Sequence, residues 1–497
     1  MLHIRVINTK GLSRAVQVIR YSNNKRIIVK HIGSGKTDDD IAALCDVGSE
    51  YIKDAEVQMP LFPDQDSRKN ILLLEQCEYL GFYYSFLYDI IYKIQAQIGY
   101  IPITDILLTD LVIMRIVEPA SKLRSIELLE TYFGISHRRQ RYYESALQWL
   151  NLKKQIEKQT LQFAIQEYKF DFSLLFYDVT TLYFETFEAD ELRKPGFSKD
   201  GKSQQPQILV GLMITPEGFP VSYEIFPGNT FEGHTILPII KSFIKEHKVQ
   251  HFTVVADAAM ISSANMEALR EAKISYIVGA RLGNISKDLF SEINTKLSRA
   301  DGNIIRIRTD KGYLICSFSK KRYAKDKFEM DKQLGKAENL LKQPSKVKNV
   351  KFLKDENKKI ELNLALIAKT TALLGVKGYY TDIEESVANN KTVIERYHEL
   401  YKIEQAFRVS KSDLQTRPIF HFKEEPIKLH MLICFMALTV SKHIEIKTAT
   451  SIRAFLTMCK KVSDARILDK TKNKEIRMRT AIPKLLNDKL KSLNLPH

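Results

Sequence analysis

Short apolar runs separated by polar turns dominate the middle of the chain, and they predict a β-sheet with interleaved helices. The five runs are 174–179, 207–215, 220–226, 252–256 and 275–278. Helical patterns flank the fourth run, at about 234–247 and 262–272. The first three runs are joined by turns or loops, so they can pair antiparallel, whereas helical crossovers make the later strands parallel. This order predicts a mixed five-stranded sheet in an α/β protein.

The first third of the chain carries two different patterns. Residues 1–60 predict a small β-rich module, because Val- and Ile-rich runs at 15–20 and 26–31 flank a polar turn. Residues 61–165 predict a helical region that begins with a long helix over 71–97. Three shorter helices follow, and the last is basic near its start, which resembles a helix-turn-helix array. Its candidate DNA contacts are Arg138, Arg139 and Arg141. Ordinary helical modules share this pattern, so DNA binding here is one of two alternatives.

The pattern changes again after residue 280. Residues 281–375 predict a β-rich, basic insertion, with paired strands at 303–308 and 312–318, a Lys-rich helix and a further strand at 361–368. From Ser319 to Ile360 there are 14 Lys/Arg and six Asp/Glu residues. This stretch either binds a polyanion or is a solvated charged surface. Residues 170–280 and 376–445 would then be two parts of one core, and 446–497 a basic helical tail.

Two helical patterns lie in the second part of that core. No Gly or Pro interrupts the chain between Gly378 and Pro418, so one helix is expected from about Ala388 past Ser410. An apolar helix follows over 425–442, and its ten-residue apolar stretch 431–440 is too short to span a bilayer. A buried core helix and no membrane association are therefore expected.

The charge balance favours a polyanionic partner. The chain has 497 residues, 76 Lys/Arg and 59 Asp/Glu, giving a net charge of +17. An excess of this size is typical of proteins that bind nucleic acid, although a soluble protein can also be basic without such a partner. The five cysteines have neither zinc-ligand nor redox-motif spacing, which indicates reduced thiols in the cytoplasm.

Two aspartates follow strands that the predicted sheet places side by side. Asp178 ends the first strand and Asp257 ends the fourth. Strands that pair in a sheet lie about 4.8 Å apart, so the two carboxylates would face each other across that gap. Facing carboxylates repel unless a cation lies between them, and divalent metal is the natural partner. A single Asp at a strand end is more often a turn or cap residue.

A third acid is expected from the helix over 388–410. Tyr397, Glu404 and Lys411 recur every seven residues, so on one helix they would drift by only about 20° per step and form a stripe. Ile403 and Phe407 flank Glu404 and can pack on the sheet. Glu404 is therefore the preferred metal ligand, with Tyr397 and Lys411 beside it to contact DNA. The alternative is an ordinary amphipathic helix with a Glu–Lys surface stripe.

These motifs resemble the insertion-sequence transposases with an Asp-Asp-Glu triad. Residues 177–181 (YDVTT) resemble the first-Asp motif, and residues 227–229 with 254–258 (VVADA) resemble the second-Asp region. More narrowly, the chain looks like the subgroup that carries a β-rich insertion before the Glu. That subgroup has a Tyr-Arg-Glu-Lys signature, which Tyr397, Glu404 and Lys411 match in spacing.

The chain departs from that subgroup at two points. Leu400 occupies the signature's Arg position, and Arg396 or Arg408 is a candidate to compensate for it. Some members stack a flipped base on a Trp of the insertion, but the only Trp here is Trp149, outside it. Either another aromatic such as Tyr313 or Phe318 replaces that Trp, or the cleavage intermediate differs.

The resemblance implies a ribonuclease H-like catalytic core and a complete activity. Asp178, Asp257 and Glu404 would bind two Mg²⁺ ions, for which Mn²⁺ can substitute, and catalyse phosphodiester cleavage at transposon ends and strand transfer into target DNA. Double-stranded DNA at terminal inverted repeats and at the target would be bound by a homodimer. The resemblance also implies that the protein is associated with the bacterial nucleoid. The expected DNA contacts near the acids are Tyr397, Arg408, Lys411 and Arg417.

Two rival functions fit the same residues. One is a metal-dependent DNA nuclease on the same fold that cuts but does not join. The other is a non-catalytic DNA-binding regulator derived from a transposase, which the presence of all three acids disfavours. Strand transfer separates the first rival from a transposase.

Overall fold

The computed structural model describes residues 2–55 and 74–495, apart from residues 10, 12, 23–24, 198–203, 248, 250–251, 261, 342–350, 357–358 and 471–472. The chain divides into two compact units. One consists of Met1–Glu78 and Leu468–Glu475, and the other of Tyr79–Ile467 and Ile476–His497. Each unit is described below by itself. All five cysteines are free thiols.

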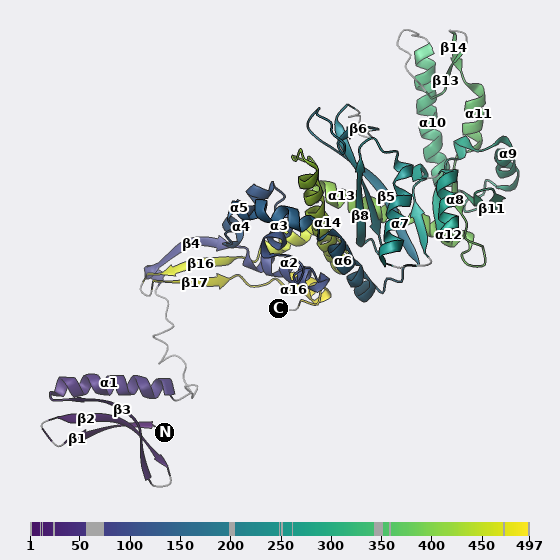
Figure 1. Ribbon diagram of the computed structural model, residues 1–497. Helices are drawn as coiled ribbons and strands as arrows, with labels where there is room; N and C mark the ends of the chain where they lie inside the picture. Colours follow the sequence, from purple (N-terminus) through teal and green to yellow (C-terminus); the bar gives the residue numbers. More distant parts are fainter. Residues whose placement is uncertain are drawn as a thin grey trace. The chain divides into compact units, whose positions relative to one another are not determined.

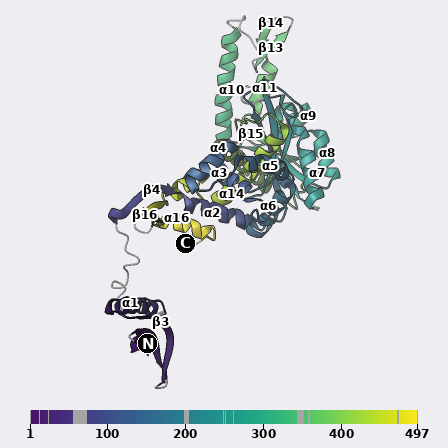
Figure 2. The ribbon, with the colours of Figure 1, turned by 60° about the vertical axis from the view of Figure 1, so that its left-hand side comes forward.

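The N-terminal module is a three-stranded antiparallel sheet with one helix. Its strands are β1 (Leu2–Asn8), β2 (Arg14–Ser22) and β3 (Lys25–Gly35), with β2 in the centre. Helix α1 (Asp38–Ala55) lies across one face of this sheet (Figures 1 and 2). Thr37 and Asp40 exchange backbone-to-side-chain hydrogen bonds at the start of α1, which satisfies otherwise unpaired amides of its first turn. The predicted hairpin is therefore confirmed.

The helical region contains five α-helices and one unexpected strand. The helices are α2 (Ser85–Ile98), α3 (Ile106–Val117), α4 (Lys122–Phe133), α5 (Arg139–Leu150) and α6 (Lys153–Tyr168). Ser121 caps α4 and Gly134 ends it in the left-handed conformation, as the sequence predicts. The long helix expected over 71–97 is wrong. Its first three residues lie outside the described part, and a short turn (Leu74–Gln76) and β4 (Cys77–Tyr83) precede α2.

The central sheet has the predicted strand order and directions. Its core strands are β5 (Leu174–Tyr183), β7 (Pro206–Ile214), β8 (Pro220–Pro227), β9 (Thr253–Ala256) and β10 (Ser275–Ala280). β7 pairs antiparallel with β5 and β8, while β9 pairs parallel with β5 and β10. The two-residue strand β6 (Lys194–Pro195) adds to the edge at β7. Helices lie on both sides of this mixed sheet. α7 (Ile236–His247) is on one side, and α13 (Tyr401–Arg408) and α14 (Glu424–Thr448) are on the other (Figure 1). α8 (Ser263–Glu271) connects β9 to β10.

The segment between β10 and β15 (Val376–Thr381) is more helical than expected. The predicted hairpin is present as β11 (Ile304–Thr309) and β12 (Gly312–Phe318), and it extends the central sheet through β15. α9 (Lys287–Lys296) precedes the hairpin, and α10 (Lys320–Leu341) follows it. The strand expected over 361–368 is wrong, because β14 (Lys359–Leu362) ends there and α11 (Leu364–Ala372) begins with Asn363 as its cap.

A small second core holds the tip of this segment together. α10 packs on β14, which pairs with β13 (Leu353–Glu356), and these elements lie side by side with α11 in both views (Figures 1 and 2). The buried residues of this second core include Met330, Phe352 and Leu374. Whether residues 281–375 act as a separate domain stays a prediction.

The single helix expected from Ala388 past Ser410 is wrong. α12 (Asn390–His398) ends, α13 (Tyr401–Arg408) begins, and a π-helical turn (Val409–Asp413) follows. The break is a tight turn, in which the amides of Leu400 and Ile403 donate to carbonyls three residues earlier. Tyr397, Leu400 and Ile403 are all buried, and a three-residue turn aligns residues at that spacing on one face. Burial thus accounts for a break that no Gly or Pro signals.

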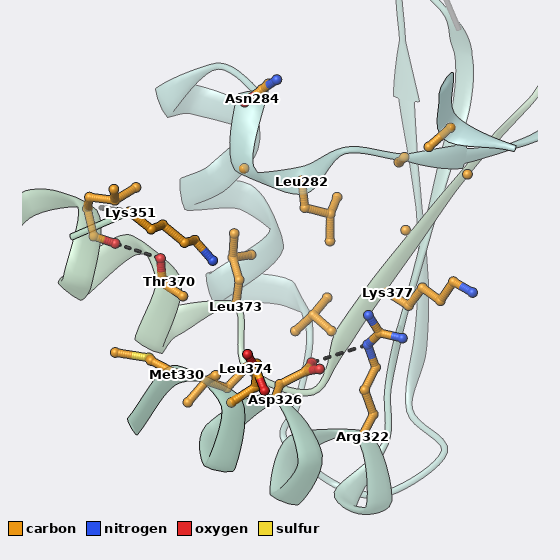
Figure 3. Close-up of a pocket in the computed structure, with 18 of the residues that line it drawn as sticks. Leu282, Asn284, Arg322, Asp326, Met330, Lys351, Thr370, Leu373, Leu374 and Lys377 are labelled. Atoms are coloured by element: carbon orange, nitrogen blue, oxygen red, sulfur yellow. Dashed lines mark hydrogen bonds and ion pairs between the residues drawn. The ribbon is translucent and has the colours of Figure 1, made fainter. Parts of the chain in front are cut away.

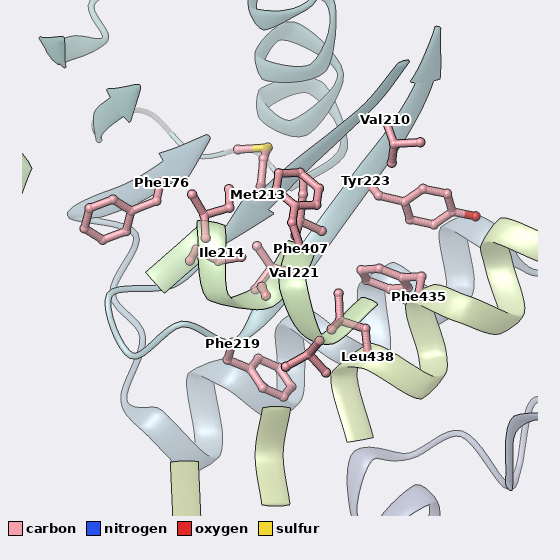
Figure 4. Packing of buried hydrophobic residues seen from close by; sticks show 14 of the residues in the cluster. Phe176, Val210, Met213, Ile214, Phe219, Val221, Tyr223, Phe407, Phe435 and Leu438 are labelled. Atoms are coloured by element: carbon pink, nitrogen blue, oxygen red, sulfur yellow. The ribbon is translucent and has the colours of Figure 1, made fainter. Parts of the chain in front are cut away.

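The C-terminal part combines a buried helix with a mixed tail. α14 (Glu424–Thr448) is long and apolar enough to cross a membrane, but 89% of its most apolar stretch is buried inside the protein, as in a core helix. Phe435 and Leu438 of α14 pack against the sheet beside Phe407 of α13 (Figure 4). The tail is not purely helical, because α15 (Ile452–Cys459) and α16 (Lys484–Ser492) enclose β16 (Asp464–Asp469) and β17 (Lys474–Arg479). β16 is the central strand of a three-stranded sheet and pairs with β17 on one side and with β4, which lies far away in the sequence, on the other.

Candidate active site

Asp178 and Asp257 occupy matching positions on two neighbouring strands. In the parallel pair β5–β9, Tyr177 is the partner of Ala256, and each aspartate is the next residue of its chain. Side chains alternate between the faces of a sheet, so the two carboxylates share the face opposite Tyr177. The Tyr177 hydroxyl donates to Thr235, just before α7, which places α7 on the other face. Both aspartates are half-buried. Asp257 directly follows β9, but the prediction that Asp178 ends its strand is wrong, because β5 continues to Tyr183 and pairs with β7 along that extension.

Each aspartate is held by the backbone. The amide of Val179 donates to Asp178 Oδ1 (2.8 Å), and the amide of Ala258 donates to Asp257 Oδ1 (2.6 Å). A hydrogen bond from an amide to a carboxylate restricts the rotation of that carboxylate. Both acids are therefore oriented by the backbone amide of the residue that follows them.

Tyr397 of α12 reaches across the sheet to Asp257. Its hydroxyl donates to Asp257 Oδ1 at 3.3 Å. Burial raises the pKa of Tyr397, and the negative charges of Asp257 and Asp178 raise it further. A side chain on Gly279 of β10 would exclude this arrangement, because a Cβ atom there would lie 2.5 Å from the Tyr397 hydroxyl oxygen. Gly279 therefore provides the space through which Tyr397 approaches the acids.

Glu404 extends from α13 on the same face of the sheet. Ile403, Ala406 and Phe407 bury one side of α13 against β5 and β7, which leaves Glu404 exposed on the other side of the short helix. The prediction that Tyr397, Glu404 and Lys411 form a stripe on one helix is wrong, because these residues lie in three different elements: α12, α13 and the π-helical turn. The break before α13 and the wider turn after it replace the uniform rotation of about 100° per residue on which a stripe depends.

Lys377 of β15 links the acids electrostatically, and no pattern in the sequence indicated it. Its ammonium group lies over the ring of Tyr397, 4.6 Å from the ring centre. Burial and the neighbouring Arg322 guanidinium lower the pKa of Lys377, while Asp257 and Glu404 oppose this by attracting the ammonium group. Tyr397 is thus coupled to Asp178 and Asp257, and Lys377 to Asp257 and Glu404. These two side chains are the links that the structure shows between the acids, and the convergence of all three acids stays a prediction.

A cavity of about 660 Å³ opens beside Asp257 and Tyr397. Lys377 and Arg322 lie on its wall, and Asp326 pairs with Arg322 (3.2 Å) along α10 (Figure 3). Arg322 comes from the segment between β10 and β15, so that segment supplies a cation to the neighbourhood of the acids. Lys351, Asp326 and Glu329 also line the cavity, so its wall carries charges of both signs beside Asp257.

The donor chemistry suits a hard divalent cation, but the ligands are not gathered. Asp178, Asp257 and Glu404 supply only oxygen donors, the kind that Mg²⁺ prefers. Among the residues that the structure describes, no group of three His, Cys, Asp or Glu side chains is arranged to hold a metal ion. The Lys377 ammonium group instead attracts two of the three acids.

Comparison with known proteins identifies the family. The sequence profile described as "Transposase DDE domain" matches residues 169–440, more than half of the chain. The chain belongs to the transposase DDE domain family. The match spans the sheet from β5, all three predicted acids and most of α14, so this transposase carries its candidate site within the family's own domain.

One solved structure and the curated proteins add little to this assignment. A cryo-electron-microscopy structure of the piggyBac transposase synaptic complex with hairpin DNA is 12% identical to this chain, with a TM-score of 0.36. The match covers 76% of this chain and 69% of the other. At such a low TM-score no conclusion follows from the likeness. No curated protein matches this transposase.

The other predicted DNA contacts fall into two groups. Arg408 is exposed on α13, Lys411 is half-buried in the π-helical turn, and Arg417 stacks on the ring of Tyr183 at the end of β5. These three lie on or beside the elements that carry the acids. By contrast, Arg138, Arg139 and Arg141 lie at the start of α5 in the helical region, away from those elements.

Charges of the same chain already engage two of the α5 arginines. Arg139 pairs with Glu127, and Arg141 lies 3.8 Å from Asp105. Their positive charge is partly neutralised within the helical region, which weakens the helix-turn-helix interpretation.

The residues at the two departures from the subgroup, and the aromatics considered as replacements, mostly have structural roles. Leu400 is buried at the break between α12 and α13, where an exposed Arg would not fit. Trp149 is buried against Tyr142, and Phe318 is also buried. Tyr313 donates to Glu384 and lies under the guanidinium of Arg306. Of the two aromatics proposed to replace the insertion Trp, only Tyr313 is accessible at all.

Proposed function

We propose that this chain is a DNA transposase that cuts transposon ends and joins them to target DNA. The observation that carries the proposal is the pair Asp178 and Asp257 at matching positions on adjacent parallel strands. Glu404 is coupled to the same region through Lys377. The strand order around this pair supports a ribonuclease H-like core, in which residues 170–280 and 376–445 together form the catalytic domain.

We further propose that Asp178, Asp257 and Glu404 hold two Mg²⁺ ions, with Mn²⁺ able to substitute. Such ions would supply activation of the attacking oxygen and stabilisation of the leaving oxygen in phosphodiester chemistry. The chain's own groups orient and complement this site. Tyr397 fixes one oxygen of Asp257, and the backbone amides of Val179 and Ala258 fix the rotation of the two aspartates. For Glu404 to join them, Lys377 must move its charge from the carboxylates to a DNA phosphate.

The remaining cations are assigned to the DNA backbone. Lys377 and Arg322 contact the strand that enters the cavity, and Arg408, Lys411 and Arg417 contact the flanking phosphates. Double-stranded DNA at the element's terminal inverted repeats and at the target is the substrate. A homodimer brings two ends together, in the cytoplasm at the bacterial nucleoid. The net charge of +17 supports a polyanionic substrate.

The test is cleavage of the DNA that flanks the gene, with the full-length protein and Mg²⁺ or Mn²⁺. Asp178→Asn, Asp257→Asn and Glu404→Gln should each abolish cleavage while DNA binding persists, because they remove a ligand charge and keep the side-chain size. Glu395→Gln is the matched control, since Glu395 is an exposed acid of α12 that pairs with Lys391. Cleavage by Glu404→Gln at the rate of Glu395→Gln would remove Glu404 from the site.

Strand transfer separates the transposase from a nuclease on the same fold. Pre-cut ends with free 3′-hydroxyl groups should be joined to a supercoiled plasmid by the wild-type protein and not by Asp257→Asn. Cleavage without joining would identify a nuclease, and binding without cleavage would identify a regulator.

A further inference from the structure

Charge is segregated between the sheet and the helix of the N-terminal module. Residues 1–37 contain eight Lys/Arg residues and no Asp or Glu. Helix α1, over 38–55, contains six acidic residues and a single Lys. Helix α1 covers one face of the sheet and leaves the other face open (Figure 2).

The packing of α1 fixes which residues lie on the open face. A Cβ atom on Gly48 of α1 would meet Ile4 of β1 at 3.3 Å, so Ile4 faces the helix. Arg14 pairs with Asp38 of α1, and Lys30 lies over the ring of Tyr51, so these two cations also lie on the helix side. Side chains alternate along a strand, and Arg5, next to Ile4, therefore faces away from α1.

Three hydrogen-bonding side chains form a row across that open face. Arg5 of β1 is the cross-strand partner of Gln17 in β2, and Gln17 is the partner of His31 in β3. Cross-strand partners lie on the same face, so all three point away from α1. Gln17 is half-buried, and among the described residues its Oε1 atom is buried without a hydrogen-bond partner. Rotation of the amide toward a donor on a bound molecule would satisfy it.

We infer that this open face reads double-stranded DNA, with Arg5, Gln17 and His31 contacting base edges. The inference rests on the proposed function, and it assigns sequence recognition to the N-terminal sheet. Three strands spaced about 4.8 Å apart are about 10 Å across, which fits the major groove width of about 12 Å. Arg and Gln are the side chains that pair with guanine and adenine edges there. The surrounding Arg and Lys residues contact phosphates on either side of the groove.

The arginines of α5 are a weaker choice for this role. Arg139 and Arg141 are engaged by Glu127 and Asp105. The N-terminal sheet, in contrast, has no acidic residue in its own sequence to compete with a phosphate. Charge complementarity thus points to the sheet as the DNA-reading surface.

Fluorescence anisotropy with the full-length protein tests the assignment. The probes are duplexes from the DNA that flanks the gene and an unrelated duplex of equal length. Arg5→Ala and Gln17→Ala should weaken binding to the flanking duplex by about 5- to 150-fold, the usual cost of a lost base contact, and change binding to the unrelated duplex much less. Arg20→Ala is the matched control, because Arg20 is exposed on β2 but alternation puts it on the helix side. It should weaken both duplexes slightly and equally.

Three results would overturn the inference. They are unchanged binding by both variants, equal losses on the two duplexes, and a wild-type protein with no preference for the flanking duplex. Circular dichroism of each variant separates a lost contact from a lost fold, and Gln17→Glu, which adds a negative charge to the face, should weaken every duplex. A cleavage assay of Asp257→Asn on the same duplex tests the proposed function separately. This variant should lose cleavage but keep its preference for the flanking duplex, because its N-terminal sheet is unchanged.

Discussion

The approach of Tyr397 over Gly279 makes a quantitative prediction about the candidate site. In Gly279→Ala the new Cβ atom would lie 2.5 Å from the Tyr397 hydroxyl oxygen, 3.1 Å from its Cζ atom and 3.3 Å from the Ala258 Cβ atom. To reach an ordinary contact of 3.4 Å, the hydroxyl must move by about 0.9 Å. Overpacking of this kind costs about 1–3 kcal/mol. The hydrogen bond to Asp257 is already 3.3 Å long, so the same movement should break it.

Removing the hydroxyl should relieve most of that cost. In the Tyr397→Phe background, the closest remaining contact of the Cβ atom introduced at position 279 is the 3.1 Å one to Cζ, which a small shift of the ring accommodates. Tyr397→Phe alone loses one hydrogen bond, about 1 kcal/mol. We therefore expect Gly279→Ala to be less costly in the Tyr397→Phe background, with a favourable coupling energy of about 1–2 kcal/mol.

Urea unfolding of the four proteins measures the coupling, with the midpoint and slope compared at each step. Cleavage is recorded in parallel, because Gly279→Ala and Tyr397→Phe should both slow it by releasing Asp257. Additive free energies of unfolding would show that Tyr397 does not contact residue 279 as described. A Gly279→Ala protein with wild-type stability would refute the steric reasoning outright.

Three further predictions concern other parts of the second unit. Lys377→Gln should slow cleavage by about 10- to 150-fold, the effect of one lost charge-assisted bond to phosphate, without lowering the melting temperature. Lys377→Arg should recover part of the cleavage rate. Equal cleavage rates for the two variants would exclude a contact between Lys377 and a phosphate. Glu157→Ala should destabilise the protein by about 2–6 kcal/mol in urea unfolding, because it leaves the buried donors of Ser222 and Tyr223 unpaired, while Lys153 keeps Glu224 as a carboxylate partner; a loss under about 1 kcal/mol would contradict this. Burial lowers the pKa of His443 to about 4, so its contribution to stability is complete above the ordinary value near 6.5 and is lost as the pH falls through 4. Unfolding measured between pH 7 and 4 should show a smaller pH dependence in His443→Gln than in the wild type, and an identical dependence would exclude this residue.

The core of the site was predictable because it depends on local patterns. Apolar runs that end in Asp178 and Asp257 define both the strands and the positions of the acids, and the order of connections makes those strands neighbours. Phe407 and Ile403 likewise indicated the buried side of α13, and both are buried. These features follow from hydrophobic periodicity within a few residues, which the sequence displays directly.

Other features depended on distant partners. The strand β4 is apolar and aromatic enough to look like the start of α2, and only its pairing with β16 makes it a strand. A strand was expected over 361–368, but β14 ends at Leu362 and the cap at Asn363 starts α11. Lys377 is one of many lysines in a basic segment, and its role appears only where β15 passes beside Tyr397.

Local residue patterns therefore specify the strands of the central sheet, their order, the matching positions of Asp178 and Asp257, and the charge segregation of the N-terminal module. Each of these is written in residue types that are adjacent in the chain. Folding in three dimensions adds the break after Tyr397 in the helix bearing Glu404, the room that Gly279 leaves for that tyrosine, and the position of Lys377 facing the acids. These depend on side-chain packing between segments more than a hundred residues apart, which no local pattern encodes.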